Sequence, residues 1–211
     1  GVPASFLLSS ATRLLSWPDY KILKELKLLK RLMNPIKHLL TYRYALIIHD
    51  QTVIFVQKYI EYNSRTSDQM EQADRSGKQN IVEGVSQIAS LKTQIKLLAV
   101  SLASFEELTA DYEDYLRQHN LEIYPKTDPK ITLFRETAYR LSNLRNLSNL
   151  GDLLEKPTLP GNPTDDANYL LTLCHIVTYL LSKQIKATEE KFIREGGYTE
   201  NLFQKRLKSL K

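Results

Sequence analysis

The chain contains little cysteine, glycine or proline. Of its 211 residues, one is cysteine, seven are glycine and eight are proline. The single cysteine, Cys174, excludes an intrachain disulfide, which favours the reducing cytoplasm as the location. It is expected to be a small core residue. Because long tracts lack both glycine and proline, helices are favoured over a turn-rich β architecture.

The sequence also lacks long apolar runs and the usual catalytic motifs. No apolar run reaches the roughly 18 residues that a membrane-spanning helix needs. The first 19 residues are not typical of a secretory signal peptide. Ser76-Gly77-Lys78 resembles part of a phosphate loop, but Gln72 and Gln79 stand where the Walker pattern needs Gly and Ser or Thr. No histidine has a glutamate three positions before it, as a di-iron bundle requires. We therefore predict no enzymatic activity, no cofactor and no metal.

Positive charge is concentrated near the N-terminus. Residues 1–50 hold eight lysines or arginines and three acidic residues, whereas the whole chain has a net charge of +5, so the remainder is neutral. We predict a basic extension over residues 1–37, partly helical or disordered, and a helical domain over residues 38–211. Within the extension, apolar residues form one helical stripe surrounded by lysines: Ile22, Leu26, Leu29 and Met33. Such a helix can lie on anionic lipid, on nucleic acid or on its own domain.

Apolar residues recur at spacings of three and four along most of the chain, which is typical of amphipathic helices. A shorter helix is expected near residues 131–147, and residues 155–166 read as a loop. Asp68 is expected to cap the second long helix, and Gly196-Gly197 to end the last one. The expected long helices cover residues 42–62, 68–88, 91–117 and 167–194. This pattern predicts an all-α fold, an antiparallel up-down four-helix bundle with a short helix inserted between the third and fourth long helices.

Small residues mark one face of the second predicted helix. Ala73, Gly77 and Gly84 lie close to one side of it, where they let a neighbouring backbone approach closely. We expect them to be packing residues. Asn80 and Glu83 are polar residues on the same packed helix, and we expect them to make buried hydrogen bonds that fix its register.

The stretch "DQMEQADRSGKQNIVEG", followed by "KLLAVSLASFEELTADYEDYL", resembles the four helix bundle family. That family includes proteins encoded by intervening sequences of bacterial large-subunit ribosomal RNA and the accessory variability protein of diversity-generating retroelements. Its pattern is Arg, a nearby Ser, then Asn-Ile-Ala-Glu-Gly, and later a Leu-rich helix with Ser and Glu-Leu. The matching residues are Arg75, Ser76, Asn80-Ile81-Val82-Glu83-Gly84, Leu98, Ser101, Ser104 and Glu107-Leu108.

The resemblance spans about residues 40–208. The segment "LLTLCHIVTYLLSKQIKATEEKFIREGGYTENLFQKR" is similar to the longer "four helix bundle suffix" branch. Two positions depart from the pattern: residues 76–79 replace the usual Ser-Ile-Pro-Ser, and Val82 stands where Ala is typical.

The resemblance implies a bundle that assembles into cyclic homo-oligomers, often pentamers, with a basic surface that meets nucleic acid. Arg65, Arg75 and Lys78 are the candidate phosphate contacts on the second helix. Alternatively, Arg75 pairs with Glu83 or another acidic residue. The candidates in the basic extension are Lys24, Lys27, Lys30 and Arg31.

Two functions of different classes remain open. In the first, the chain is a non-enzymatic oligomeric scaffold that binds RNA or DNA, or a nucleic-acid-processing protein such as a reverse transcriptase. In the second, it is a protein-interaction bundle whose basic amphipathic helix docks a protein partner or a membrane surface, without nucleic acid. Steep salt dependence of binding to RNA or DNA would distinguish the first, because counterion release scales with phosphate contacts.

Overall fold

A computed structural model of the chain describes residues 35–87, 89–148 and 153–209. The chain divides into two units, Gly1–Pro35 and Ile36–Lys211, and every described residue except Pro35 belongs to the second. Nearly all of the predicted basic extension, including Lys24, Lys27, Lys30 and Arg31, lies outside the described residues.

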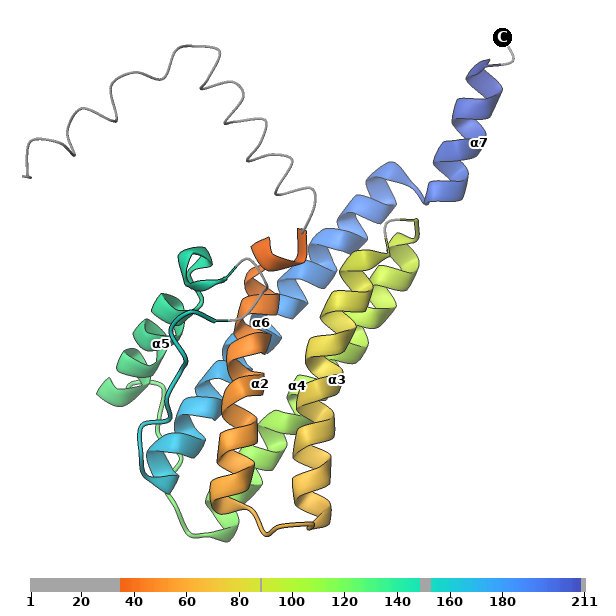
Figure 1. Ribbon diagram of the computed structural model, residues 1–211. Helices are drawn as coiled ribbons and strands as arrows, with labels where there is room; N and C mark the ends of the chain where they lie inside the picture. The colour runs from red at the N-terminus through yellow and green to blue at the C-terminus, as the bar shows by residue number, and fades with distance from the viewer. Residues whose placement is uncertain (1–34, 88, 149–152, 210–211) are drawn as a thin grey trace, which may run out of the picture. The chain divides into compact units, whose positions relative to one another are not determined.

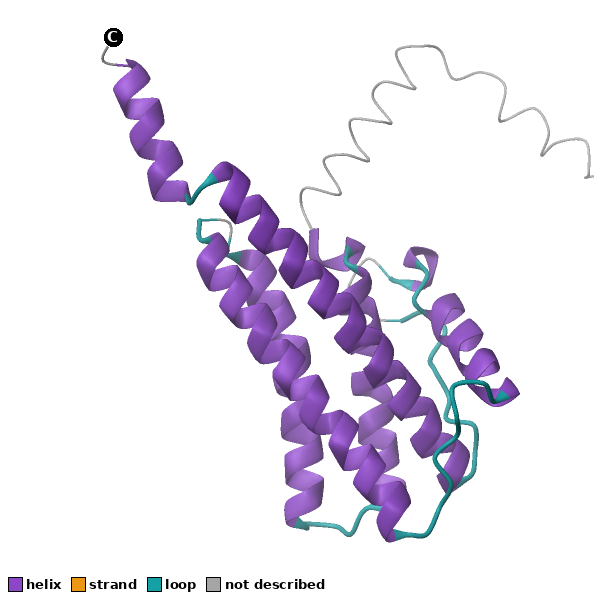
Figure 2. Cartoon of the chain, turned by 180° about the vertical axis from the view of Figure 1, so that it is seen from behind, coloured by secondary structure: helices purple, strands orange, loops and turns teal. Residues whose placement is uncertain are grey.

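The described residues are helical apart from their connecting loops, which confirms the all-α prediction (Figure 2). Apart from one isolated bridge between Leu147 and Leu153, they form no β-structure. The elements, in chain order, are η2 (Pro35–His38), α2 (Leu40–Tyr59), α3 (Arg65–Ser86), α4 (Leu91–Gln118), α5 (Pro129–Leu141), η3 (Leu144–Asn146), α6 (Pro163–Glu195) and α7 (Tyr198–Ser209).

Five of these helices pack together (Figure 1). Helix α2 contacts α3 and α6, and α4 contacts the same two helices from the other side. The short helix α5 packs mainly on α6, with a smaller contact to α2. A short helix between the third and fourth long helices is therefore present, as the sequence predicts.

Two of the helix starts differ from the predictions by four residues. Helix α3 begins after Ser64, whose hydroxyl oxygen accepts a hydrogen bond from the Ser67 amide at 3.1 Å. The predicted cap, Asp68, instead lies in the first turn, where its negative charge interacts favourably with the positive end of the helix dipole. Helix α6 begins at Pro163, inside the predicted loop, because Asn162 caps it. A proline in the first turn loses no helical hydrogen bond.

Buried aromatic residues fill the core between α2 and α4. The ring of Phe55 meets Tyr112 and Tyr115 edge-on, with centroids 5.1 and 5.0 Å apart. The Tyr112 hydroxyl forms a hydrogen bond of 2.9 Å with Thr52, so its buried polar atom is satisfied. Cys174 is fully buried, as expected for a core residue, and burial raises the pKa of its thiol.

Small residues bring α3 and α4 close together. A Cβ atom added at Gly77 would lie 2.7 Å from Cε2 of Phe105, and one at Gly84 would lie 3.3 Å from Cβ of Leu97. The Ser101 hydroxyl donates to the Gly77 carbonyl at 2.7 Å. The glycine of the phosphate-loop-like stretch is therefore a contact point between two helices.

Candidate nucleic-acid interface

The three candidate phosphate contacts on α3 do not form one cluster. Arg65 is the first residue of the helix, and Arg75 lies ten residues later. At 1.5 Å per residue the two positions are about 15 Å apart along the axis. Only Arg75 and Lys78 are neighbours, one helical turn apart.

Lys78 is half-buried beside acidic groups. Burial lowers the pKa of its ammonium and the nearby Arg75 lowers it further, whereas Asp74 and Asp50 raise it. Because its charge already faces two carboxylates, Lys78 has less positive potential to offer a phosphate. Arg65 and Arg75 are both exposed and remain available.

The alternative role of Arg75, an ion pair with Glu83 or another acidic residue, is not seen among the described residues. Within residues 35–87, 89–148 and 153–209, Arg75 forms no ion pair. Glu83 is exposed and accepts a hydrogen bond from Gln79 at 3.0 Å. The prediction that Glu83 makes a buried hydrogen bond is therefore wrong, because its side chain points to solvent. Asn80 is half-buried and donates to the Ser76 carbonyl at 2.9 Å, a bond within its own helix.

A partly buried polar pair joins α2 to α3 beside these residues. Nδ1 of His49 lies 2.5 Å from Oδ2 of Asp74, whose side chain is only 1% exposed. Burial raises the pKa of Asp74, and the contact with His49 opposes that shift. His49 is a polar residue among apolar neighbours on α2, and this position is the sequence signal that could have indicated a polar partner on a neighbouring helix. Ala73, Gly77 and Gly84 are buried on the same helix, α3.

Charge changes sign along α4. Its first half carries Lys92 and Lys96 and no acidic residue. Its second half has Arg117 as its only basic residue, and its acidic residues are Glu106, Glu107, Asp111, Glu113 and Asp114. Burial and then the charges of Asp114 and Glu107 raise the pKa of Asp111, so these carboxylates share one electrostatic environment.

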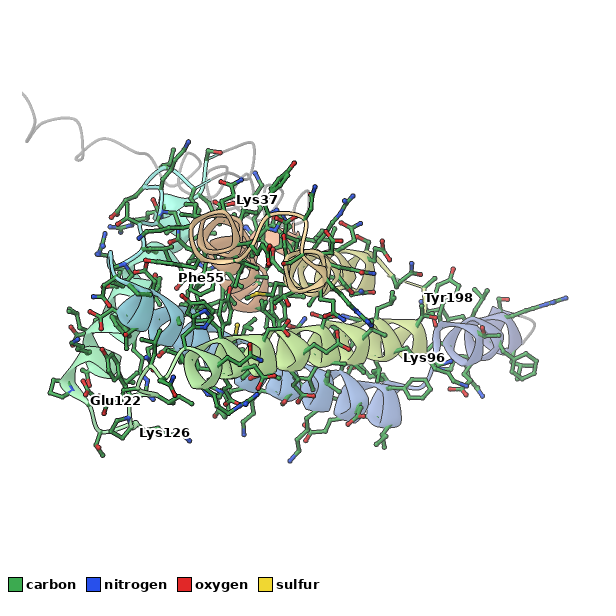
Figure 3. The ribbon with its side chains drawn as sticks, turned by 90° about the horizontal axis from the view of Figure 1, so that it is seen from below. Lys37, Phe55, Lys96, Glu122, Lys126 and Tyr198 are labelled. Carbon is green, nitrogen blue, oxygen red and sulfur yellow. The ribbon has the colours of Figure 1, made fainter. Side chains whose placement is uncertain are left out.

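Helix α6 shows the same change in the opposite chain direction. Its first turn contains Asp165 and Asp166, and its later turns carry four exposed basic residues interspersed with three acidic ones. The basic residues are Lys183, Lys186, Lys191 and Arg194. In Figure 3, Lys96 lies toward the end of the unit that carries Tyr198, and Glu122 and Lys126 lie at the opposite end. We call Lys92 and Lys96 on α4, together with the four basic residues of α6, the basic end.

The described residues contain no group of three or more His, Cys, Asp and Glu side chains that could hold a metal ion. Within the same ranges, no helix has the length and apolar character needed to cross a membrane.

Comparison of the chain with protein-family models, with curated proteins and with solved structures finds no match.

Proposed function

We propose that the chain is a non-enzymatic, oligomeric helical-bundle scaffold that binds RNA or DNA, or a nucleic-acid-processing protein such as a reverse transcriptase, through the basic end. The observation that carries this proposal is the separation of charge along α4 and α6. A polyanion is attracted to one end of these helices and repelled from the other, so the separation supports a defined binding orientation.

The proposed architecture is an antiparallel up-down four-helix bundle made of α2, α3, α4 and α6. Two hydrogen bonds between α2 and α6 support it: Thr41, early on α2, donates to Gln184, late on α6, at 2.8 Å. Tyr59, late on α2, donates to Asp166, early on α6, at 2.7 Å. Opposite chain directions are expected for bundle neighbours.

Oligomerisation would supply affinity that one copy lacks. The later turns of α6 also carry three acidic residues, Glu189, Glu190 and Glu195, which offset much of the local positive charge. Repeating a weakly basic end around a closed ring multiplies the number of phosphates that can be contacted at once. We therefore propose a cyclic homo-oligomer, with a pentamer as the form that the family resemblance implies.

The test is binding of a fluorescent 20-nucleotide RNA and its DNA counterpart, measured by anisotropy between about 50 and 200 mM salt. We expect the Lys92→Gln, Lys96→Gln double variant to bind more weakly, with a salt slope reduced by about one per lost phosphate contact. Lys126→Gln is the matched control, because Lys126 lies at the opposite end of the unit (Figure 3). Arg75→Gln measures the contribution of α3. Absence of binding by the full chain at low salt, or equal losses in the control, would overturn the proposal.

One observation favours the second candidate function, docking on a protein or a membrane. Helix α7 carries four large apolar residues that are all exposed: Tyr198, Leu202, Phe203 and Leu207. Basic residues share the helix with them: Lys205, Arg206 and Lys208. Binding to anionic vesicles without binding to RNA or DNA would support this alternative.

A further inference from the structure

The segment between α4 and α6 forms a cleft of about 590 Å³ against α6. A four-helix arrangement does not need this segment, which contains α5. The volume lies within the range of small-ligand sites. The floor of the cleft is formed by buried residues: Ile131 of α5 and Leu171 and Thr172 of α6.

Hydrogen bonds from a buried residue of α6 hold the rim of the cleft. Asn168 is 1% exposed, and its Oδ1 accepts from the Tyr124 amide at 2.8 Å. Its Nδ2 donates to the carbonyls of Glu122 and Thr164, also at 2.8 Å. The Tyr124 hydroxyl donates to Asp165 at 2.5 Å. Because the loop is attached to α6 at several points, the cleft is preformed, and binding there requires little ordering of the chain.

Apolar side chains along the cleft remain accessible. Ile123 is 48% exposed and Tyr179 is 62% exposed, and Ile176, which also lines the cleft, is half-buried. The cleft therefore offers apolar surface that the described residues do not cover.

Two basic side chains line the same cleft without partners among the described residues. Lys126 comes from the loop after α4 and Arg135 from α5, and neither takes part in a recorded hydrogen bond or ion pair within those ranges. Both are exposed, and Glu113 of α4 is the one carboxylate in the lining. The cleft thus combines an apolar floor with an excess of positive charge.

These charged groups all act on one imidazole. Burial lowers the pKa of His175, the charges of Lys126 and Arg135 lower it further, and Glu113 raises it. Groups from α4, the following loop and α5 therefore face the same point on α6. An anion placed among them would interact with His175 as well.

We propose that this cleft binds a small amphipathic carboxylate, with its apolar part on Ile131, Leu171 and Ile176 and its carboxylate held by Arg135 and Lys126. The planar guanidinium of Arg135 suits a carboxylate through two parallel N–H···O bonds, and Lys126 adds a point charge. This inference does not depend on nucleic-acid binding, because Lys126 lies at the opposite end of the unit from Lys96 (Figure 3).

The test uses octanoate as the probe and 1-octanol as its uncharged counterpart, each titrated into the full chain by calorimetry. We expect saturable binding of octanoate with one site per chain, and binding of 1-octanol weaker by about tenfold or more, since one charge-assisted hydrogen bond accounts for such a factor. Arg135→Gln should weaken octanoate binding by a similar factor. Lys96→Gln, a change outside the lining of the cleft, should leave it unchanged.

A second readout follows His175 by NMR of its imidazole resonances. Octanoate in the cleft should raise the pKa of His175, because the added negative charge favours the imidazolium, and Arg135→Gln should reduce that rise. The proposal is overturned if octanoate and 1-octanol bind equally, if neither saturates, or if Arg135→Gln binds as tightly as the unchanged chain. It is also overturned if Tyr179→Glu breaks up an oligomer, because the cleft would then be a subunit interface.

Discussion

Helices α3 and α7 are both amphipathic, yet the apolar residues of α3 are largely buried and those of α7 are exposed. On α3 they are buried against neighbouring helices: Met70, Ala73, Gly77, Ile81 and Gly84. On α7 no residue is buried, although Leu202 and Phe203 are as apolar as any of these. An apolar stripe therefore predicts a contact but does not say which molecule supplies the other side of it.

Local interactions at the start of α7 support its helical form, since none of its residues is buried. The carboxylate of Glu200 accepts from the Gly197 amide at 2.7 Å, and Asn201 donates to the Glu195 carbonyl at 2.8 Å. Such caps satisfy backbone groups that a helix end leaves free. A 12-residue helix is nevertheless marginal in water without a packing partner. Helix α3 is stabilised by its contacts with α2 and α4. Helix α7 depends on its caps and on any molecule that binds its exposed apolar face.

The largest effect is expected where α3 touches α4. Gly77→Leu would force a side chain into the ring of Phe105, which is fully buried. We expect the free energy of unfolding to fall by about 3 kcal/mol, the upper part of the usual range for overpacking. Gly84→Leu should cost less, because its nearest contact is 3.3 Å rather than 2.7 Å. Urea denaturation followed by circular dichroism measures both.

The control for Gly77→Leu is Ala99→Leu on the neighbouring helix, where the position is exposed. That change should alter the free energy of unfolding by no more than about 0.5 kcal/mol. If Gly77→Leu is equally harmless, the close approach of α3 and α4 at this point does not exist.

The four long helices, α2, α3, α4 and α6, could be predicted from the sequence because their apolar residues recur regularly at spacings of three and four. The start of α4 at Leu91 and the end of α6 before Gly196 agree with the predictions. The starts of α3 and α6 were missed because several residues near each could serve as the cap. Ser64 and Asp68 are both good caps, and only the backbone shows which one is used. At α6, Asn162 and Pro163 carry the capping signal, but they stand in a stretch rich in proline and glycine that is equally typical of a loop.

The arrangement of the candidate site residues is harder to predict from the sequence than the fold. A sequence lists charges but does not say which ones face each other across helices. Arg65, Arg75 and Lys78 looked like a group, whereas the excess of positive charge at the basic end arises from pairing the start of α4 with the end of α6. Helix α7 was not predicted as a separate element, because Gly196 and Gly197 were read only as the end of the preceding helix.

A smaller loss is expected for a buried hydrogen bond within the packed helices. Tyr112→Phe keeps the aromatic contacts with Phe55 but removes the hydroxyl that bonds Thr52 at 2.9 Å. We expect the free energy of unfolding to fall by about 1–2 kcal/mol, because the Thr52 hydroxyl is left buried without a partner. The double variant Tyr112→Phe, Thr52→Val should recover part of that loss. A double variant as unstable as the sum of the two single variants would contradict this interpretation.

The pH dependence of stability tests whether folding lowers the pKa of His175, which lines the cleft from α6. The pKa of His175 lies below its ordinary value of 6.5 in the folded chain, first because of burial. The unfolded chain therefore binds a proton more readily, so the contribution of this group is fully present above pH 6.5 and is lost as pH falls through the folded pKa. We expect His175→Gln to flatten the decline in stability below pH 6.5, as measured by melting temperatures in matched buffers. An unchanged pH profile would mean that partial burial and the nearby charges do not lower the pKa of His175 in the folded chain.

The smallest effect is expected on α7, and it completes the comparison with α3. Leu202→Ala removes a large apolar side chain that is 53% exposed, on a helix in which no residue is buried. The free energy of unfolding of the dilute chain should therefore change by no more than about 0.5 kcal/mol. Repeating the measurement at high protein concentration adds the contribution of a second copy, because any contact between copies stabilises the folded state by mass action. A loss above about 1 kcal/mol in the dilute chain would show that α7 packs on its own domain, since truncating a solvated leucine costs far less than truncating a buried one. A loss confined to the concentrated chain would instead assign the apolar face of α7 to an interface between copies.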